Sequence, residues 1–309
     1  MTGSAWGQMM LLASIWGGSF LAIRIALDDI APLTVVAHRT LWAMLVLWGV
    51  VALMRLPLPR APRVWFGFLG MGLLNNVIPF SLMAWGQLHI ETGLTSILNA
   101  STAIFGVIAA ALFFADERIT ARKSVGVVLG FFGVATAIGL DNFRNFDLRS
   151  LAQLSIIGGT IAYALAGVWA RHFLSGLAPQ VAAAGMLSGA TLITLPLAWW
   201  VDGPLRLDLP PATLLAIGYY AIVATAGAYL LYYRVLAIAG AGNLMLVTLL
   251  VAPVAITLGA VVRGEALGPN AFAGFALLAL GLAILDGRLW AMLRRAGLRR
   301  VVDRRRPPS

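Results

Sequence analysis

The feature that most constrains this chain is a series of apolar stretches, each about 20 residues long, separated by short polar or proline-containing breaks. That length lets an α-helix cross the hydrocarbon core of a bilayer. Ten such stretches take up most of the 309 residues and leave no room for a soluble catalytic or ATP-binding domain. The sequence predicts an all-α integral membrane protein with ten transmembrane helices, over 4–27, 33–54, 63–87, 91–114, 121–139, 151–173, 180–201, 212–236, 241–263 and 268–290.

The composition excludes the main soluble alternatives. Hydrophobic residues make up 61% of the chain and charged residues 11%, and the mean hydropathy is +0.90. A soluble domain has about 25% charged residues, and a disordered chain is poor in hydrophobic residues. The chain has no cysteine, which excludes disulfides, thiolate metal sites and cysteine nucleophiles. The first stretch lacks a basic segment before it and is too long for a signal peptide, so we expect a retained helix.

The basic residues predict the orientation. The net charge is +10, and the segment 291–309 is rich in arginine, as expected of a basic cytoplasmic tail that contacts anionic lipid rather than nucleic acid. With a cytoplasmic N-terminus, 16 Lys and Arg residues fall inside and 6 outside, the latter including Arg24 and Arg39. Cytoplasmic loops carry the excess of such residues. Both termini are therefore predicted to be cytoplasmic, in a multi-pass protein of the cell (inner) membrane with an external 141–149 loop.

The chain also shows an internal repeat. The polar stretch 141–149 separates five apolar segments from five others, which gives halves of 4–139 and 151–290. At an offset of 148 residues Glu117 aligns with Glu265, each just before the last helix of its half. An odd number of helices in each half turns the second half upside down relative to the first. A 5+5 inverted repeat of this kind is typical of secondary transporters, whose substrate path lies between the halves near the midplane.

The opening Trp16-Gly17-Gly18-Ser19-Phe20 resembles the start of EamA domains in the drug/metabolite transporter superfamily. Each half also ends as these domains do, with an acid followed by a glycine-spaced helix. The resemblance covers 4–290 and implies two EamA-like five-helix repeats, no use of ATP, and export or exchange of small organic solutes such as amino acids. The second half departs from the pattern, because Ala162-Tyr163-Ala164 stands where the first half has Trp-Gly.

Polar and aromatic residues within the helices are the candidate cavity residues. Buried amides are costly in lipid, so they either line a cavity or bond neighbouring helices, and a mid-helix proline kinks the chain. Aromatic rings near the midplane either stack on a substrate or pack, and those at segment ends belong to the interface. The predicted substrate-binding residues are Trp16, Asn75, Asn76, Pro79, Trp85, Asn99, Tyr163, Trp169 and Tyr229.

Glycines and acids carry further expectations. The pair Gly17-Gly18 weakens the first helix and permits bending. Glycines at matching positions of the fifth and tenth segments should let these helices approach closely. We expect Glu117 and Glu265 to cap helices. All twelve acids and the three histidines lie at or near segment ends, His38 being the deepest. The matching glycines are Gly126, Gly133, Gly274 and Gly281.

These features predict a secondary transporter or facilitator that exports amino acids or similar small metabolites by alternating access through a central cavity. Without an acid at the midplane, we expect uniport. One alternative is a proton-coupled drug or metabolite exporter, and another is an integral membrane enzyme that modifies lipid. No nucleotide-binding, zinc-protease or serine-hydrolase motif stands out, so no catalytic residue, cofactor or metal is predicted. The expected partners are a small solute and membrane lipids, not nucleic acid.

Overall fold

A computed structural model describes residues 3–115, 120–138, 148–239 and 241–286, and every regular element in these ranges is helical. Glu117, most of the 141–149 loop and the 291–309 tail lie outside the described residues. The first half comprises α1 (Gly3–Ala26), α2 (Pro32–Leu53), α3 (Pro62–Gly72), η1 (Leu73–Val77), α4 (Ile78–Gly86), α5 (Thr92–Asn99), α6 (Thr102–Phe113) and α7 (Ala121–Ile138). The second comprises α8 (Leu148–Phe173), α9 (Pro179–Val201), α10 (Pro211–Ile217), η3 (Gly218–Gly227), α11 (Ala228–Ala239), α12 (Ala241–Arg263) and α13 (Pro269–Asp286).

The helix bounds follow the apolar stretches closely. Within the described part, eight helices are long and apolar enough to cross a membrane, and two shorter apolar helices cover Leu250–Arg263 and Pro269–Leu285. Prolines begin many of them, as at Pro32, Pro62 and Pro179. Proline suits the first position of a helix because the N–H that it lacks would have no partner inside the helix.

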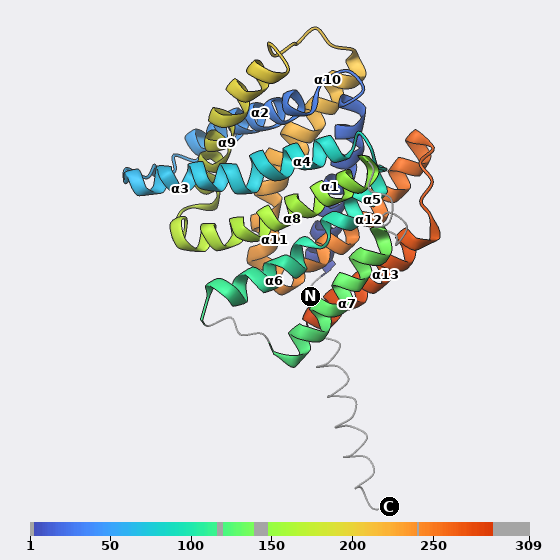
Figure 1. Ribbon diagram of the computed structural model, residues 1–309. Coiled ribbons are helices and arrows are strands. Elements are labelled where there is room, and N and C mark those ends of the chain that lie inside the picture. The colour runs from blue at the N-terminus through green and yellow to red at the C-terminus, as the bar shows by residue number, and fades with distance from the viewer. Residues whose placement is uncertain (1–2, 116–119, 139–147, 240, 287–309) are drawn as a thin grey trace, which may run out of the picture.

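Several helices of the first half recur at matching positions in the second. Pro269–Asp286 lies 148 positions after Ala121–Ile138 at both ends, and α8 ends 147 positions after α1. The packing repeats as well: α7 packs against α13, α2 against α9, and the contact of α1 with α12 recurs between α8 and α6. Figure 1 shows the helices gathered in one bundle, with α7 and α13 side by side at one edge.

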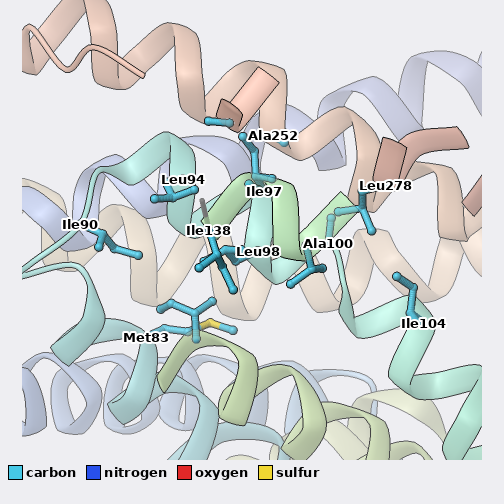
Figure 2. Packing of buried hydrophobic residues seen from close by; sticks show 14 of the residues in the cluster. Met83, Ile90, Leu94, Ile97, Leu98, Ala100, Ile104, Ile138, Ala252 and Leu278 are labelled. Atoms are coloured by element: carbon cyan, nitrogen blue, oxygen red, sulfur yellow. The ribbon is translucent and has the colours of Figure 1, made fainter. Parts of the chain in front are cut away.

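The contact between α7 and α13 confirms the close approach predicted from the glycines. A Cβ atom at Gly133 would lie 2.5 Å from the backbone nitrogen of Leu278, and one at Gly281 would lie 2.7 Å from the carbonyl oxygen of Gly126. Leu278 belongs to the largest buried hydrophobic cluster, which also includes Ile97 and Ile104 (Figure 2). The glycines therefore fix the backbone separation on which this cluster depends.

Three of the helices that the structure describes are irregular near their middles. The third and eighth helices of the chain contain π-helical segments, η1 and η3, and η1 shifted by 148 positions falls inside η3. The fourth is interrupted between Asn99 and Thr102, where the Thr102 hydroxyl donates to the Asn99 carbonyl over 2.7 Å. Irregular backbone at membrane depth occurs where it is buried in protein or lines a cavity.

Gly17-Gly18, which we expected to weaken the first helix, does not interrupt α1, which runs from Gly3 to Ala26. A Cβ atom at Gly17 would lie 2.6 Å from the side chain of Val254, and one at Gly18 would lie 2.5 Å from the Tyr219 hydroxyl. The glycine pair thus serves close packing of α1 against α12 and η3.

Candidate functional site

The centre of the bundle holds a cation that the sequence reasoning missed. Arg39 lies seven residues into α2, about 10 Å from its start at 1.5 Å per residue. Its Nε donates to the Thr225 hydroxyl over 2.9 Å, and its guanidinium carbon lies 3.8 Å from the centroid of the Phe80 ring. No carboxylate of the described residues forms an ion pair with it. The charge count of the loops places Arg39 among the external basic residues, whereas in the structure it is a half-buried cation within α2.

Asn75 and Asn76 of η1 lie beside Tyr229, which is itself close to Arg39. Asn75 donates to the Tyr229 hydroxyl over 3.2 Å and contacts the sulfur of Met186 at 3.3 Å. Asn76 is fully buried, and neither polar atom of its amide has a hydrogen-bond partner among the described residues. Tyr229 lies close enough to interact with Asn76 and with Arg39. The predicted residues Asn75, Asn76 and Tyr229 are therefore brought together.

Aromatic rings complete this central cluster, which we define as Arg39, Asn75, Asn76, Phe80, Tyr163, Tyr220, Thr225 and Tyr229. Tyr163 meets Phe80 edge to face, with ring centroids 6.5 Å apart. Tyr220 is fully buried, and its hydroxyl has no partner among the described residues. The cluster joins side chains of both halves, from α2, η1 and α4 in the first and from α8, η3 and α11 in the second.

The other predicted residues have contacts of their own outside this cluster. Trp16 packs against Tyr232 at 5.9 Å, and Trp85 stacks near His89 at 4.9 Å, one turn on. Pro79 faces Gly159, where α4 crosses α8.

Trp169 and Asn99 also have structural surroundings of their own. The indole N–H of Trp169 donates to the Gly67 carbonyl over 2.9 Å, and its ring packs on Phe173 at 4.4 Å. Asn99 ends α5 at the helix interruption, and its side-chain oxygen is buried without a partner among the described residues. Trp169 thus has a hydrogen-bond partner and a packing partner of its own, whereas the side-chain oxygen of Asn99 has no partner among the described residues.

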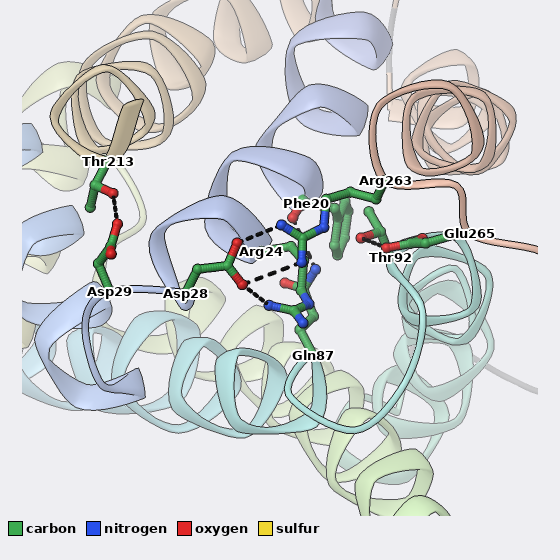
Figure 3. A network of polar contacts seen from close by, with 9 residues as sticks. All are labelled: Phe20, Arg24, Asp28, Asp29, Gln87, Thr92, Thr213, Arg263 and Glu265. Carbon is green, nitrogen blue, oxygen red and sulfur yellow. Dashed lines mark hydrogen bonds and ion pairs between the residues drawn. The ribbon is translucent and has the colours of Figure 1, made fainter. Parts of the chain in front are cut away.

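Most of the described acids gather at one end of the bundle, the acidic end, which contains Asp28, Asp29, Glu91, Asp202 and Glu265. Arg24 and Arg263 both bind Asp28, at 2.8 Å and 2.5 Å, and so join α1 to the end of α12 (Figure 3). The hydrogen bond from Arg263 lowers the pKa of Asp28, and the nearby charge of Arg24 adds to this effect. Asp28 is therefore ionised at neutral pH.

Glu265 does not act as the simple helix cap that we predicted. Its Oε1 accepts the Thr92 hydroxyl over 2.7 Å, which ties the α12–α13 turn to the start of α5, and its Oε2 is buried without a partner among the described residues. Nearby, the Gln87 amide donates to the Phe20 carbonyl over 2.9 Å (Figure 3). The bond between Thr92 and Glu265 joins the two halves, and the bond between Gln87 and Phe20 joins α1 to the end of α4 within the first half.

Two hollows open toward opposite ends of the bundle. A hollow of about 310 Å³ at the acidic end is lined by Arg24, Gln87, Glu91, Arg263 and Glu265 among others. A hollow of about 170 Å³ lies between α3, α8, α9 and α11, and Met186 lines it. Because Met186 also contacts Asn75, this second hollow adjoins the central cluster.

Comparisons with known proteins agree with this architecture. A transporter of uncharacterised function from Archaeoglobus fulgidus is 25% identical over 91% of this chain and 98% of its own length. A probable terminal-alkyne amino-acid exporter from Streptantibioticus cattleyicolor is 25% identical over 93% of this chain and 95% of its own. A probable amino-acid metabolite efflux pump from Escherichia coli is 23% identical over 89% and 92%.

A solved crystal structure shares the fold, with a TM-score of 0.63, 19% sequence identity, and coverage of 92% of this chain and 98% of the other. The sequence matches the EamA-like transporter family twice, over residues 4–139 and 150–285. The two matches span most of the chain and include one copy in each half. The resemblance seen in the first helix therefore extends through both halves, and the chain belongs to the EamA-like transporter family.

Proposed function

We propose that this protein exports amino acids or similar small metabolites by alternating access through a central cavity. Membership of the transporter family over both halves carries the transport part of the proposal. The names of the exporter relatives from S. cattleyicolor and E. coli support amino acids or their metabolites as substrates. The central cluster supports a path between the halves, because unsatisfied polar groups at membrane depth suit a cavity that receives a solute.

The proposed architecture is a ten-helix, 5+5 inverted repeat with halves 4–139 and 151–290. Matching helix lengths, recurring contacts between halves and the two π segments at equivalent positions support it. In transporters built this way, one half rocks against the other around a fixed central site. The polar bonds at the acidic end, which must break and reform in such a motion, are surface ion pairs and single hydrogen bonds of modest strength.

We further propose uniport. The described acids lie at the ends of the bundle, as at Asp28, Glu91 and Glu265, so the central cluster contains no carboxylate to carry a proton. His38 is buried, and its Nδ1 accepts the indole N–H of Trp42. A proton-coupled exporter remains the alternative, with Glu265 and His38 as the groups to test first.

The test of function is counterflow in proteoliposomes with a panel of labelled amino acids. We expect preloaded unlabelled amino acid to drive uptake of the label without ATP and without change to the vesicle lipids. With substrate equal on both sides, an imposed proton or sodium gradient should produce no net accumulation. Uphill accumulation that an ionophore abolishes would replace uniport by ion coupling, and altered lipid would favour the enzyme alternative.

We propose that both termini are cytoplasmic and that the acidic end faces outward. Arg55, Arg60 and Arg63 lie in or just after the turn at the other end, and Arg39, now placed within α2, leaves the count of external loop residues. The absence of cysteine makes single-cysteine labelling clean. With an impermeant maleimide on intact cells, Asn145→Cys should react and Ser309→Cys should react only after permeabilisation. The reverse pattern would invert the topology.

A further inference from the structure

We propose that Arg39 is the anion-binding residue of the cavity and that the transported solutes carry a carboxylate, which the open edge of the guanidinium binds. This inference rests on the proposed transport function and names the chemical group that the site selects. The charge of Arg39 is not balanced by an acid among the described residues. A cation inside the membrane is costly and normally pairs with an acid. Arg24, Arg149 and Arg263 have carboxylate partners at the acidic end, whereas Arg39 has none among the described residues.

The guanidinium is held in a fixed orientation with one edge unused. Thr225 accepts its Nε–H, and Phe80 covers one face. A guanidinium has five N–H donors, and the four on its two Nη atoms have no acceptor among the described residues. Two parallel N–H groups on adjacent nitrogens match the two oxygens of a carboxylate. The protein thus positions the group but leaves its bidentate edge for a ligand.

Asn76 and Tyr220 of the central cluster also lack hydrogen-bond partners. Asn76 and Tyr220 are fully buried, and the Asn76 amide and the Tyr220 hydroxyl form no hydrogen bond with the described residues. Tyr220 and Tyr229 lie near enough to Arg39 for electrostatic interaction, and Asn76 is a neighbour of Tyr229. A buried polar group without a partner costs about 1–3 kcal/mol. A polar solute that binds Arg39 would satisfy these groups at the same time.

The side chains of the cluster differ in how well they would bind the carboxylate, the ammonium and the apolar part of a substrate. The carboxylate finds a matching cation, whereas an ammonium finds only neutral acceptors, such as the Asn76 side-chain oxygen and the hydroxyls of Tyr220 and Tyr229. The rings of Phe80 and Tyr163 offer an apolar surface. The site should therefore accept amino acids and simple carboxylic acids with apolar groups, and reject the corresponding amines and amides.

The experiment compares a matched set of competitors in counterflow of labelled L-phenylalanine, or of the panel member exchanged fastest. The set comprises the amino acid, its deaminated acid (3-phenylpropionate) and its amide (L-phenylalaninamide). For the wild type we expect both acids to inhibit at least about tenfold more strongly than the amide, because only they form the charge-assisted pair. Equal inhibition by acid and amide would overturn the inference while leaving the transport function intact.

Substitutions then assign the preference to Arg39. In Arg39→Gln the acid-to-amide ratio should fall to near one, and Arg39→Lys should retain part of it because the charge remains but the fork is lost. Arg60→Gln, in an exposed turn, is the control and should leave the ratio unchanged. A purely structural role for Arg39 would lower folded yield without changing the ratio among surviving molecules. A wild-type ratio in folded Arg39→Gln would refute the proposal.

The inference can be tested even if the wild type exchanges none of the panel, an outcome that defeats the proposed amino-acid export. The purified protein is then unfolded thermally in detergent with 3-phenylpropionate, benzoate or benzamide. Stabilisation by the two acids but not by benzamide, and its loss in Arg39→Gln, would support a carboxylate site. Failure of both acids to stabilise the wild type would exclude it.

Discussion

Replacing Gly133 by leucine should remove most of the folded protein from the membrane. The position has no space for a side chain, since even a Cβ atom would lie 2.5 Å from the Leu278 nitrogen and 2.8 Å from the Gly274 carbonyl oxygen. These neighbours are backbone atoms, so relief requires α7 and α13 to separate. Overpacking a close-packed interior costs about 1–3 kcal/mol even where side chains can move, and more is expected here. Monodisperse yield in detergent size-exclusion chromatography measures the effect.

Gly167→Leu provides the matched control. Gly167 lies in α8, is exposed, and has nothing within 4 Å of where a Cβ atom would stand. The same substitution should therefore leave the yield near that of the wild type, and it removes a residue of poor helix propensity. Normal yield of Gly133→Leu would mean that α7 and α13 do not pack through their glycines.

The helices could be predicted well because bilayer thickness and proline both act locally. A polar break, a proline and about 20 apolar residues define a helix without knowledge of its neighbours, as at Pro32 and Pro179. The glycine contact of α7 with α13 was also predictable, since glycines repeated on one helix face indicate close approach. The interruption after Asn99 also has a signal in the sequence, the three polar residues of Asn99-Ala100-Ser101-Thr102 inside an apolar stretch.

The central cluster could be predicted only in part because membership depends on which side of a helix faces inward. Asn75 and Asn76 were visible as amides at mid-membrane, where lipid exposure is costly. Arg39 was placed in an outer loop because it lies close to the start of its apolar stretch. The π segment η3 has no proline beside it, in contrast to η1 with Pro79, and so gave no warning that Tyr220 and Thr225 would face Arg39.

The sequence predicts both Tyr163 and Trp169 of α8 as substrate-binding aromatic residues, but their substitution should have opposite effects on stability and transport. The Trp169 ring fills space against Gly70 and Phe173 and its N–H bonds to the Gly67 carbonyl. Truncating a fully buried tryptophan to alanine costs about 3–5 kcal/mol, and Trp169 is half-buried, so Trp169→Ala should lower the unfolding midpoint by about 5–10 °C. Transport per folded molecule should change little, because the ring lies outside the central cluster.

Tyr163→Phe should show the reverse pattern. The substitution keeps the ring that packs on Phe80 and removes only a hydroxyl that has no hydrogen-bond partner among the described residues. Stability should stay within about 1 kcal/mol of the wild type, since no internal hydrogen bond is lost. Transport should fall about threefold to tenfold, because one hydrogen bond to a bound solute is worth roughly 0.5–1.5 kcal/mol. Unfolding midpoints and counterflow rates, both normalised to folded protein, separate the two roles. Slow transport in folded Trp169→Ala together with normal transport in Tyr163→Phe would contradict this assignment. It would indicate a substrate path away from Arg39, near the C-terminal end of α8 where Trp169 lies.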